Sequence, residues 1–142
     1  MKKVQDVLGV KGRDVWSISA TASVFDALKL MAEKEIGALV VLEGRKIVGI
    51  ISERDYARKV ILYGRSSPTT LVSEIMTTQV AYTQLDQNIE ECMHIMTERR
   101  IRHLPVMGND QLIGIISIGD LVKAIISEQK FMIEQLERYI TS

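Results

Sequence analysis

The chain contains one sequence unit twice, at a spacing of 65 residues. GIISERD at 49–55 recurs as GIISIGD at 114–120, and ALKLMAEKEIGALVV (27–41) aligns without a gap with CMHIMTERRIRHLPV (92–106). A repeat of this period indicates that one structural unit has been duplicated. The copies span about 18–62 and 83–127, so any fold for this chain must use the same unit twice.

Each copy has the apolar spacing of a short strand, a helix, a strand hairpin and a second helix. The first copy predicts a strand at 15–18, a helix over 24–32, two strands around the turn 43–46, and a helix from Ser52 or Glu53 to Gly64. The second predicts a strand at 80–83, a helix over 88–99, strands at 103–107 and 112–117 around Gly108-Asn109-Asp110, and a helix from Ile118. The predicted fold class is therefore α/β (α+β), with two β-α-β-β-α units.

One such unit has too little core to fold alone, so we expect the two to pack sheet to sheet about a pseudo-twofold axis. The predicted organisation places residues 1–64 in the first repeat with its N-terminal segment and residues 77–130 in the second. A bridge rich in Gly, Ser, Pro and Thr occupies 65–76, and 131–142 form a C-terminal helical extension.

Composition narrows the classes of function. Lysine plus arginine and aspartate plus glutamate both number 18 among 142 residues, so no net field attracts nucleic acid or an anionic membrane. The apolar runs are shorter than the roughly 20 residues that span a bilayer, and MKKVQDVLGVKGRD carries no export signal. The single Cys92 fits a buried position in a reducing compartment. We expect a cytoplasmic protein that binds neither nucleic acid nor membrane.

Each repeated motif ends with a serine and an aspartate, where a buried strand gives way to a helix. They are Ser52 and Asp55 in the first copy, and Ser117 and Asp120 in the second. In one interpretation they are helix caps that satisfy free backbone N–H groups. In the other, the aspartate accepts hydrogen bonds from the paired hydroxyls of a ribose, and the serine and helix N-terminus suit a phosphate or ribose oxygen.

The doubled h-G-h-h-S-x-x-D motif after a helix–strand–hairpin unit resembles a tandem pair of CBS domains, the Bateman module. The similarity covers about residues 5 to 130 and includes KGRDVWSI (11–18), IGALVV (36–41) and MTERRIRHLPV (96–106). It is greatest with small stand-alone bacterial proteins that have no catalytic or channel domain. Because the sequence also lacks a nucleophile–base pair or a metal motif, we predict that the chain is not an enzyme.

The resemblance implies two ligand clefts, each built from both copies. The first would use Lys11, Gly12, Trp16, Ile18, Ile36, Gly37, Ala38, Ser117 and Asp120. The second would use Ser52, Asp55, Thr77, Ala81, Thr83, Ile101, Arg102 and His103. In each cleft the aspartate would bind ribose hydroxyls, and adenine would lie between apolar walls. Arg54 is a further candidate for phosphate contact, with exposure to solvent as the open alternative, and Trp16 is either core or adenine contact.

The implied ligand is an adenine nucleotide, AMP first, with ATP, ADP, NAD(H) and S-adenosylmethionine as alternatives. Binding would change the packing between repeats and so regulate an unidentified enzyme or transporter. The competing hypothesis is a ligand-free structural or oligomerisation scaffold in which the motifs are only helix caps. After Asp120, LVKAIISEQKFMIEQLERYI continues as an apolar-rich helix, so we expect a homodimer through this tail.

Overall fold

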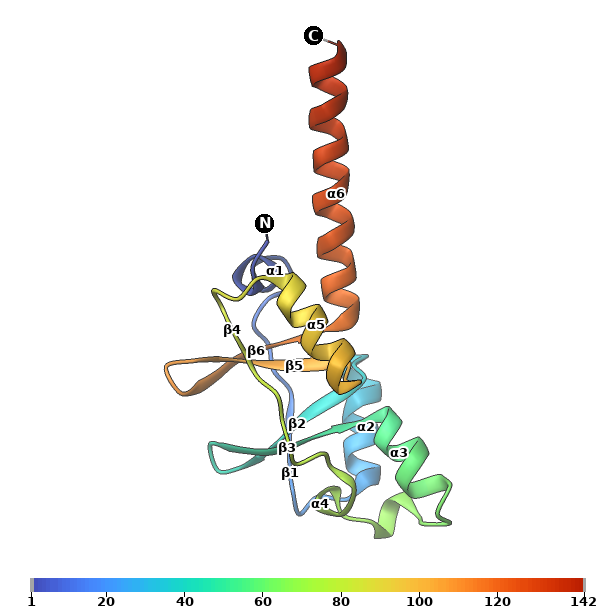
Figure 1. Cartoon of the computed structure of the whole chain (residues 1–142). Coiled ribbons are helices and arrows are strands. Elements are labelled where there is room, and N and C mark those ends of the chain that lie inside the picture. Colours follow the sequence, from blue (N-terminus) through green and yellow to red (C-terminus); the bar gives the residue numbers. More distant parts are fainter. Residues whose placement is uncertain (1, 142) are drawn as a thin grey trace. The chain divides into compact units, whose positions relative to one another are not determined.

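The computed structural model describes residues 2–141 and divides into two compact units. The continuous unit is Val15–Val80. The split unit combines the residues up to Asp14 with those from Ala81 onward. Each unit contains one three-stranded sheet, so the expected mixed fold with a duplicated core is confirmed (Figure 1). The sheet-to-sheet packing of the two units stays a prediction.

The continuous unit has the sheet order β1-β2-β3, with β1 parallel and β3 antiparallel to the middle strand. Its elements are β1 (Ser17–Ser19), α2 (Val24–Lys34), β2 (Ala38–Glu43), β3 (Lys46–Ser52), α3 (Glu53–Tyr56), a π-helical turn η1 (Ala57–Ile61), a 3-10 turn η2 (Ser67–Thr69) and α4 (Val72–Ile75). Its core is formed by buried residues of the sheet and helices, among them Val24, Met31, Leu39, Ile51 and Ile75.

The split unit has the equivalent sheet order β4-β5-β6. Its elements are α1 (Val4–Lys11), β4 (Thr83–Gln84), α5 (Ile89–Arg99), β5 (His103–Gly108), β6 (Gln111–Ser117) and α6 (Ile118–Thr141). The hairpin register shifts between Val106 and Met107, as it does between Val41 and Leu42 in the other copy. The two copies therefore share even this register shift in the hairpin.

Local chemistry explains where these elements begin and turn. The side chain of Ser23 accepts a hydrogen bond from the Asp26 amide, and Asn88 caps α5 in the same way through the Glu91 amide. The tight turn of the second hairpin is made by Asn109 and Asp110, with φ of 51° and 60°. Both residue types tolerate positive φ, which the turn between these strands requires.

The first helix of the chain packs in the unit of the second repeat. Val4, Val7 and Leu8 are buried in a core cluster that also contains Ile89 and Leu104. The sequence prediction placed the N-terminal segment with the first repeat, whereas the structure groups it with residues from 81 onward. Burial of the apolar face of α1 accounts for this position, because those three side chains have their apolar partners in the second copy.

The short helix α4 has the same place in the continuous unit that α1 has in the split unit. Lys3, before α1, forms an antiparallel bridge with Asn88, and Leu71, before α4, forms one with Ser23. The backbone bonds also correspond, with Gln5 N donating to Leu85 O at 3.0 Å and Ser73 N donating to Ala20 O at 3.0 Å. Each unit therefore takes its leading helix from the segment that precedes the other copy in sequence.

Candidate functional site

Asp120 is fixed at the start of α6, directly after β6. Its Oδ2 accepts a hydrogen bond from the Ser117 amide at 2.8 Å, and its own amide donates to Ser117 Oγ at 3.1 Å. This reciprocal pair is a capping box, which satisfies two N–H groups at the beginning of the helix. The expectation that serine and aspartate cap the helix is therefore met in the second copy.

Asp55 has the equivalent geometry at the start of α3. Its Oδ2 accepts from the Ser52 amide at 2.9 Å and from Ser52 Oγ at 3.1 Å, and its amide donates back to Ser52 Oγ at 3.2 Å. Both repeated aspartates thus fold back onto their own helices. What differs between the copies is the set of partners on the remaining carboxylate surface.

A lysine contacts each aspartate. Lys11, at the end of α1, lies 2.6 Å from Asp120 Oδ2 and donates a second hydrogen bond to the Ile115 carbonyl at 2.8 Å. Lys59, in η1, lies 3.1 Å from Asp55 Oδ1 and donates to the Ile75 carbonyl at 2.9 Å. In each unit the ammonium group therefore connects the leading helix, α1 or α4, with the residues around the aspartate.

Sequence reasoning assigned Lys11 through the family resemblance but missed Lys59. A signal for Lys59 existed, because an aspartate and a lysine four residues apart lie on one face of a helix. The pairing of Lys11 with Asp120 had no such local signal, since 109 residues separate the two in the chain.

Charge and burial shift two pKa values in the split unit. Burial alone would raise the pKa of Asp120, but the hydrogen bonds from Lys11 and Ser117 outweigh it and hold the pKa below its usual value. Burial lowers the pKa of His103 to about 4, with the Lys11 charge acting in the same direction and the Asp120 charge opposing it. His103 is therefore neutral at pH 7 and forms no cationic contact there.

Two predicted site residues contribute backbone carbonyls to the beginning of the helices that follow the motifs. The Gly37 carbonyl accepts from the Glu53 amide at 3.1 Å, and the equivalent Arg102 carbonyl accepts from the Ile118 amide at 2.9 Å. Thr83 is buried, and its hydroxyl bonds Gln87 Oε1 at 2.6 Å, so this side chain belongs to the core. The two carbonyls therefore help to hold the beginning of each motif helix, and the Thr83 hydroxyl is already bonded within its own unit.

Trp16 is partly exposed, and its ring carries the Lys34 ammonium 4.1 Å from the ring centroid. A cation over an indole face is a favourable contact. Trp16 was expected to lie either in the core or against adenine. Its exposure excludes a fully buried core position.

The predicted site residues divide between the two units. The split unit contains Lys11, Gly12, Ala81, Thr83, Ile101, Arg102, His103, Ser117 and Asp120. The continuous unit contains Trp16, Ile18, Ile36, Gly37, Ala38, Ser52, Arg54, Asp55 and Thr77. Within the split unit, the structure brings His103 close enough to Lys11 and Asp120 for their charges to act on its pKa. Both clefts draw on residues of the two units and stay predictions.

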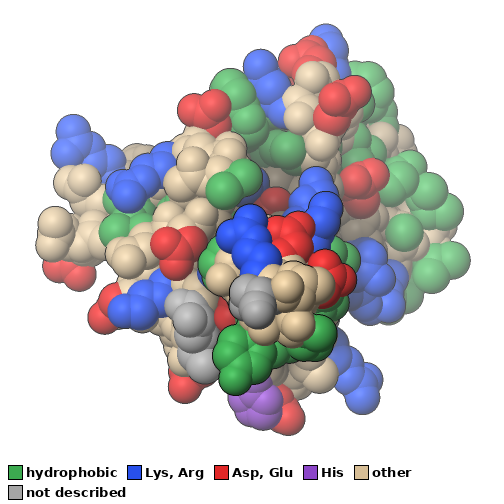
Figure 2. Space-filling view, turned by 90° about the horizontal axis from the view of Figure 1, so that it is seen from above, with side chains coloured by type: hydrophobic (Ala, Val, Ile, Leu, Met, Phe, Trp, Pro, Cys, Tyr) green, Lys and Arg blue, Asp and Glu red, His purple; other side chains and the backbone are tan. Residues whose placement is uncertain are grey.

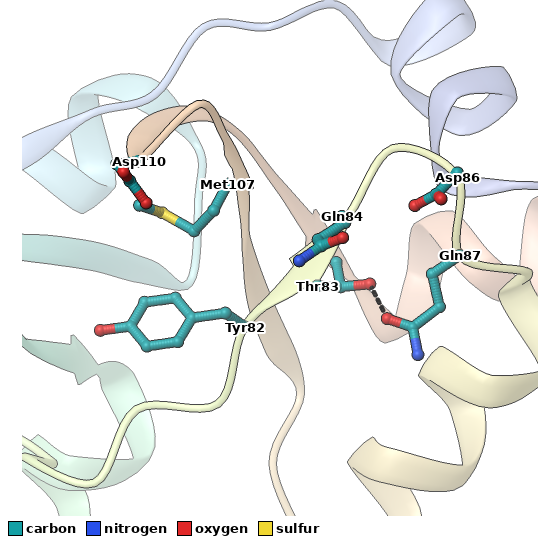
Figure 3. A pocket seen from close by; sticks show the side chains of 7 residues that line it. All are labelled: Tyr82, Thr83, Gln84, Asp86, Gln87, Met107 and Asp110. Atoms are coloured by element: carbon teal, nitrogen blue, oxygen red, sulfur yellow. Dashed lines mark hydrogen bonds between the residues drawn. The ribbon is translucent and has the colours of Figure 1, made fainter.

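The split unit also has an open hollow of about 590 Å³ at the edge of β4. Figure 3 shows Tyr82, Met107 and Asp110 at one end and Asp86 and Gln87 at the other, with Thr83 bonded to Gln87 between the β4 strand and the following loop. Thr83 is the residue that this hollow shares with the predicted clefts, and its side chain is already occupied. The motif aspartates do not line it.

Within residues 2–141, no group of three or more histidine, cysteine, aspartate or glutamate side chains could hold a metal ion. None of the helices in the described part of the chain has the length and apolar character needed to cross a membrane. Cys92 is buried, as expected, and burial raises the pKa of its thiol.

These features define a duplicated α+β module. In each copy the hairpin is followed by a helix whose first turn is capped through an aspartate, and a lysine forms an ion pair with that aspartate. The chain belongs to the CBS domain family, whose model matches residues 4–61 and 72–127. A relative from Arabidopsis thaliana, the CBS domain-containing protein CBSX3, mitochondrial, is 39% identical over 96% of this chain and 71% of its own length.

Solved structures agree with this assignment. A putative signal-transduction protein with CBS domains from Burkholderia ambifaria matches with a TM-score of 0.87 and 52% identity, covering 90% of this chain and 96% of that one. A CBS domain pair solved in complex with 5′-methylthioadenosine and S-adenosyl-L-methionine shares the fold, with a TM-score of 0.80 at 22% identity, over 90% of this chain and 98% of that one.

Proposed function

We propose that the chain is a regulatory module that binds an adenine nucleotide, AMP in the first place, through Asp120 and Asp55. The supporting observation is that both carboxylates are held at equivalent positions, at the ends of β6 and β3, in a member of the CBS domain family. A CBS domain pair with the same fold was solved in complex with two adenosine compounds, which supports the choice of an adenosine ligand.

The capping bonds are compatible with ligand binding. In Asp120 they use Oδ2, and Oδ1 has no hydrogen bond from any of residues 2–141. A carboxylate has about four acceptor positions, so a capped aspartate can still receive ribose hydroxyls. The capping box also holds the carboxylate in one orientation, which lowers the entropy lost on binding.

Binding regulates only if the nucleotide prefers one arrangement of the two repeats over another. AMP has about 23 non-hydrogen atoms, and at about −0.3 kcal/mol each the binding free energy is roughly −7 kcal/mol, or a Kd of about 10 µM. Occupancy would then follow changes in nucleotide concentration, and the regulated partner would be an enzyme or transporter.

The proposal is tested by calorimetry with AMP, ATP, NADH and S-adenosylmethionine on the wild type, Asp120→Ala and Asp55→Ala. Asn88→Ala and Ser23→Ala are the matched controls, because each removes a helix cap in the same unit without touching a motif carboxylate. We expect all four variants to lose about 1 kcal/mol of stability, and only the aspartate variants to lose a nucleotide site, each the site of its own carboxylate. Unchanged binding in both aspartate variants would show that the two motifs are only helix caps, and no binding to the wild type would favour the ligand-free scaffold.

We also propose that α6 pairs with α6 of a second copy. Beyond Ala124 the helix buries no side chain, and it extends away from the rest of its unit (Figure 1). Seen from above, hydrophobic side chains gather on one side of the helix end and charged ones on the other (Figure 2). The apolar stripe has helical spacing and consists of Ile126, Met132, Ile133, Leu136, Tyr139 and Ile140, all more than half exposed.

The exposed area suits a second copy. Six such side chains present roughly 100 Å² each, so two copies would bury about 1,200 Å², the lower end of specific interfaces. The stripe contains no charged residue, so it is complementary to itself. Light scattering should give a dimer for the wild type and Glu134→Gln, whose residue lies on the opposite face, and a monomer for Leu136→Glu. A monomeric wild type would exclude this pairing.

A further inference from the structure

The carboxylates of the two motifs differ in the acceptor positions that remain free. On Asp120, the Ser117 amide and the Lys11 ammonium both bond Oδ2. The Ser117 hydroxyl also lies near enough to this carboxylate to lower its pKa. The hydrogen bonds and the ion pair found for the Asp120 carboxylate within residues 2–141 are all at Oδ2, which leaves acceptor positions on Oδ1. The paired hydroxyls of a ribose require two acceptor positions, and one oxygen of Asp120 supplies both.

On Asp55 both oxygens are already engaged. Oδ2 accepts two hydrogen bonds from Ser52, and Oδ1 lies 3.1 Å from Lys59 Nζ. About one acceptor position is left, which is too few for two hydroxyl groups. Lys59 is also held on its other side by the Ile75 carbonyl at 2.9 Å, so its ammonium is fixed beside the carboxylate.

The position of Lys59 has no counterpart in the second repeat. At the spacing of 65 the equivalent residue is Ala124, and the ammonium group beside Asp120 comes from α1 instead. Lys11 approaches the oxygen that already caps the helix, whereas Lys59 approaches the oxygen that does not. The two hairpins and the hydrogen bonds that begin the following helices are therefore alike, and the two copies differ in what their aspartates can accept.

We propose that Lys59 makes the two nucleotide sites unequal, so that Asp120 binds ribose first and Asp55 binds it only after Lys59 is displaced. This inference rests on the proposed nucleotide function and adds an order of occupancy to it. Lys59 is a positioning residue, since it acts through the Asp55 carboxylate. Filling of the two sites at different concentrations would widen the range over which the module responds.

Calorimetry with AMP on the full chain tests the proposal. The wild type should show a tight site that Asp120→Ala removes and Asp55→Ala preserves. Lys59→Gln should tighten the weaker site by about fivefold, the effect expected when a partly exposed ion pair is released. Lys46→Gln is the charge-matched control in the same unit, because Lys46 is exposed at the start of β3, and it should leave both sites unchanged.

Melting temperatures separate positioning from a general structural effect. Lys59→Gln loses the bond to Ile75, so its melting temperature should fall while its second site tightens. Lys59→Arg should keep the second site weak. A tight site that depends on Asp55, or two equal sites in the wild type, would overturn the order of occupancy and leave nucleotide binding intact. If none of the four adenosine compounds gives heat or raises the melting temperature of the wild type, both proposals are overturned.

Discussion

Gly114 in β6 lies so close to Leu8 in α1 that a Cβ on the glycine would be 2.9 Å from Leu8 Cδ1. Gly49, its repeat equivalent in β3, would place a Cβ 2.8 Å from both Met76 Sδ and the Thr77 carbonyl oxygen. Glycine at the head of each motif therefore leaves room for a helix or loop that packs over the strand.

Substitution of these glycines should destabilise the chain to different extents. We expect Gly49→Ala to cost about 2–3 kcal/mol, because the Thr77 backbone has to move, and Gly114→Ala about 1 kcal/mol, because the Leu8 side chain can shift. Chemical denaturation measures both. Gly9→Ala is the control, since nothing lies within 4 Å and alanine favours the helix. Equal losses at 49 and 114 would contradict the distinction between backbone and side-chain contact.

Truncation of Leu8 should weaken the unit of the second repeat. Leu8 is 2% exposed, and Leu8→Ala should cost about 2–5 kcal/mol. Hydrogen exchange should show protection falling first in β5, β6 and α5, and later in β1 to β3. Val10→Ala changes a residue on the same helix that is 90% exposed and should have no effect. If protection is lost earlier in β1 to β3, the packing of α1 in the split unit is contradicted.

Acid should destabilise the chain through His103. Its folded pKa of about 4 lies below the ordinary value of 6.5, so the unfolded state binds more protons between these values. Stability should therefore fall as pH drops from 6.5 towards 4, by about 3 kcal/mol at most. His103→Gln should flatten this part of the pH profile, whereas His94→Gln should preserve it. A profile independent of His103 would contradict the burial of a neutral imidazole.

Glycine should stabilise the end of α2. Glu35 has a left-handed backbone, with φ of 54°, and non-glycine residues are strained there. Glu35→Gly should raise the free energy of unfolding by about 0.5–1 kcal/mol, measured by thermal or denaturant unfolding. Glu33→Gly, inside the same helix, should lower it by about 1 kcal/mol. Destabilisation by both substitutions would show that Glu35 contributes a contact larger than its backbone strain.

Much of each repeat was predictable because local sequence controls it. The apolar spacing of residues 36–52 sets the hairpin, and Ser23 and Asn88 cap helices by bonds to amides three residues away. The capping role of the two aspartates followed from their position after a buried strand. These features depend on neighbours in sequence, and that dependence makes them visible without coordinates.

What escaped prediction depends on contacts between distant segments. VQDVL (4–8) and VSEIM (72–76) are similar at a spacing of 68, not 65, so an alignment fixed on the main repeat passes over them. The contact of Lys59 with Asp55 follows a local rule, but its bond to the Ile75 carbonyl needs the position of α4. The two different environments of the repeated aspartates could not be deduced from identical motifs.

The assignment of α1 to the split unit bears on the order in which the protein can acquire its structure during synthesis. Val15–Val80 contains every segment that its own core uses, so all of these segments have been synthesised before the second copy is complete. The apolar side of α1, although it is translated before that unit, meets partners such as Ile116 and Leu121 only after the second copy has been synthesised. During synthesis α1 therefore stays without its apolar partners for longer than any segment of Val15–Val80 does.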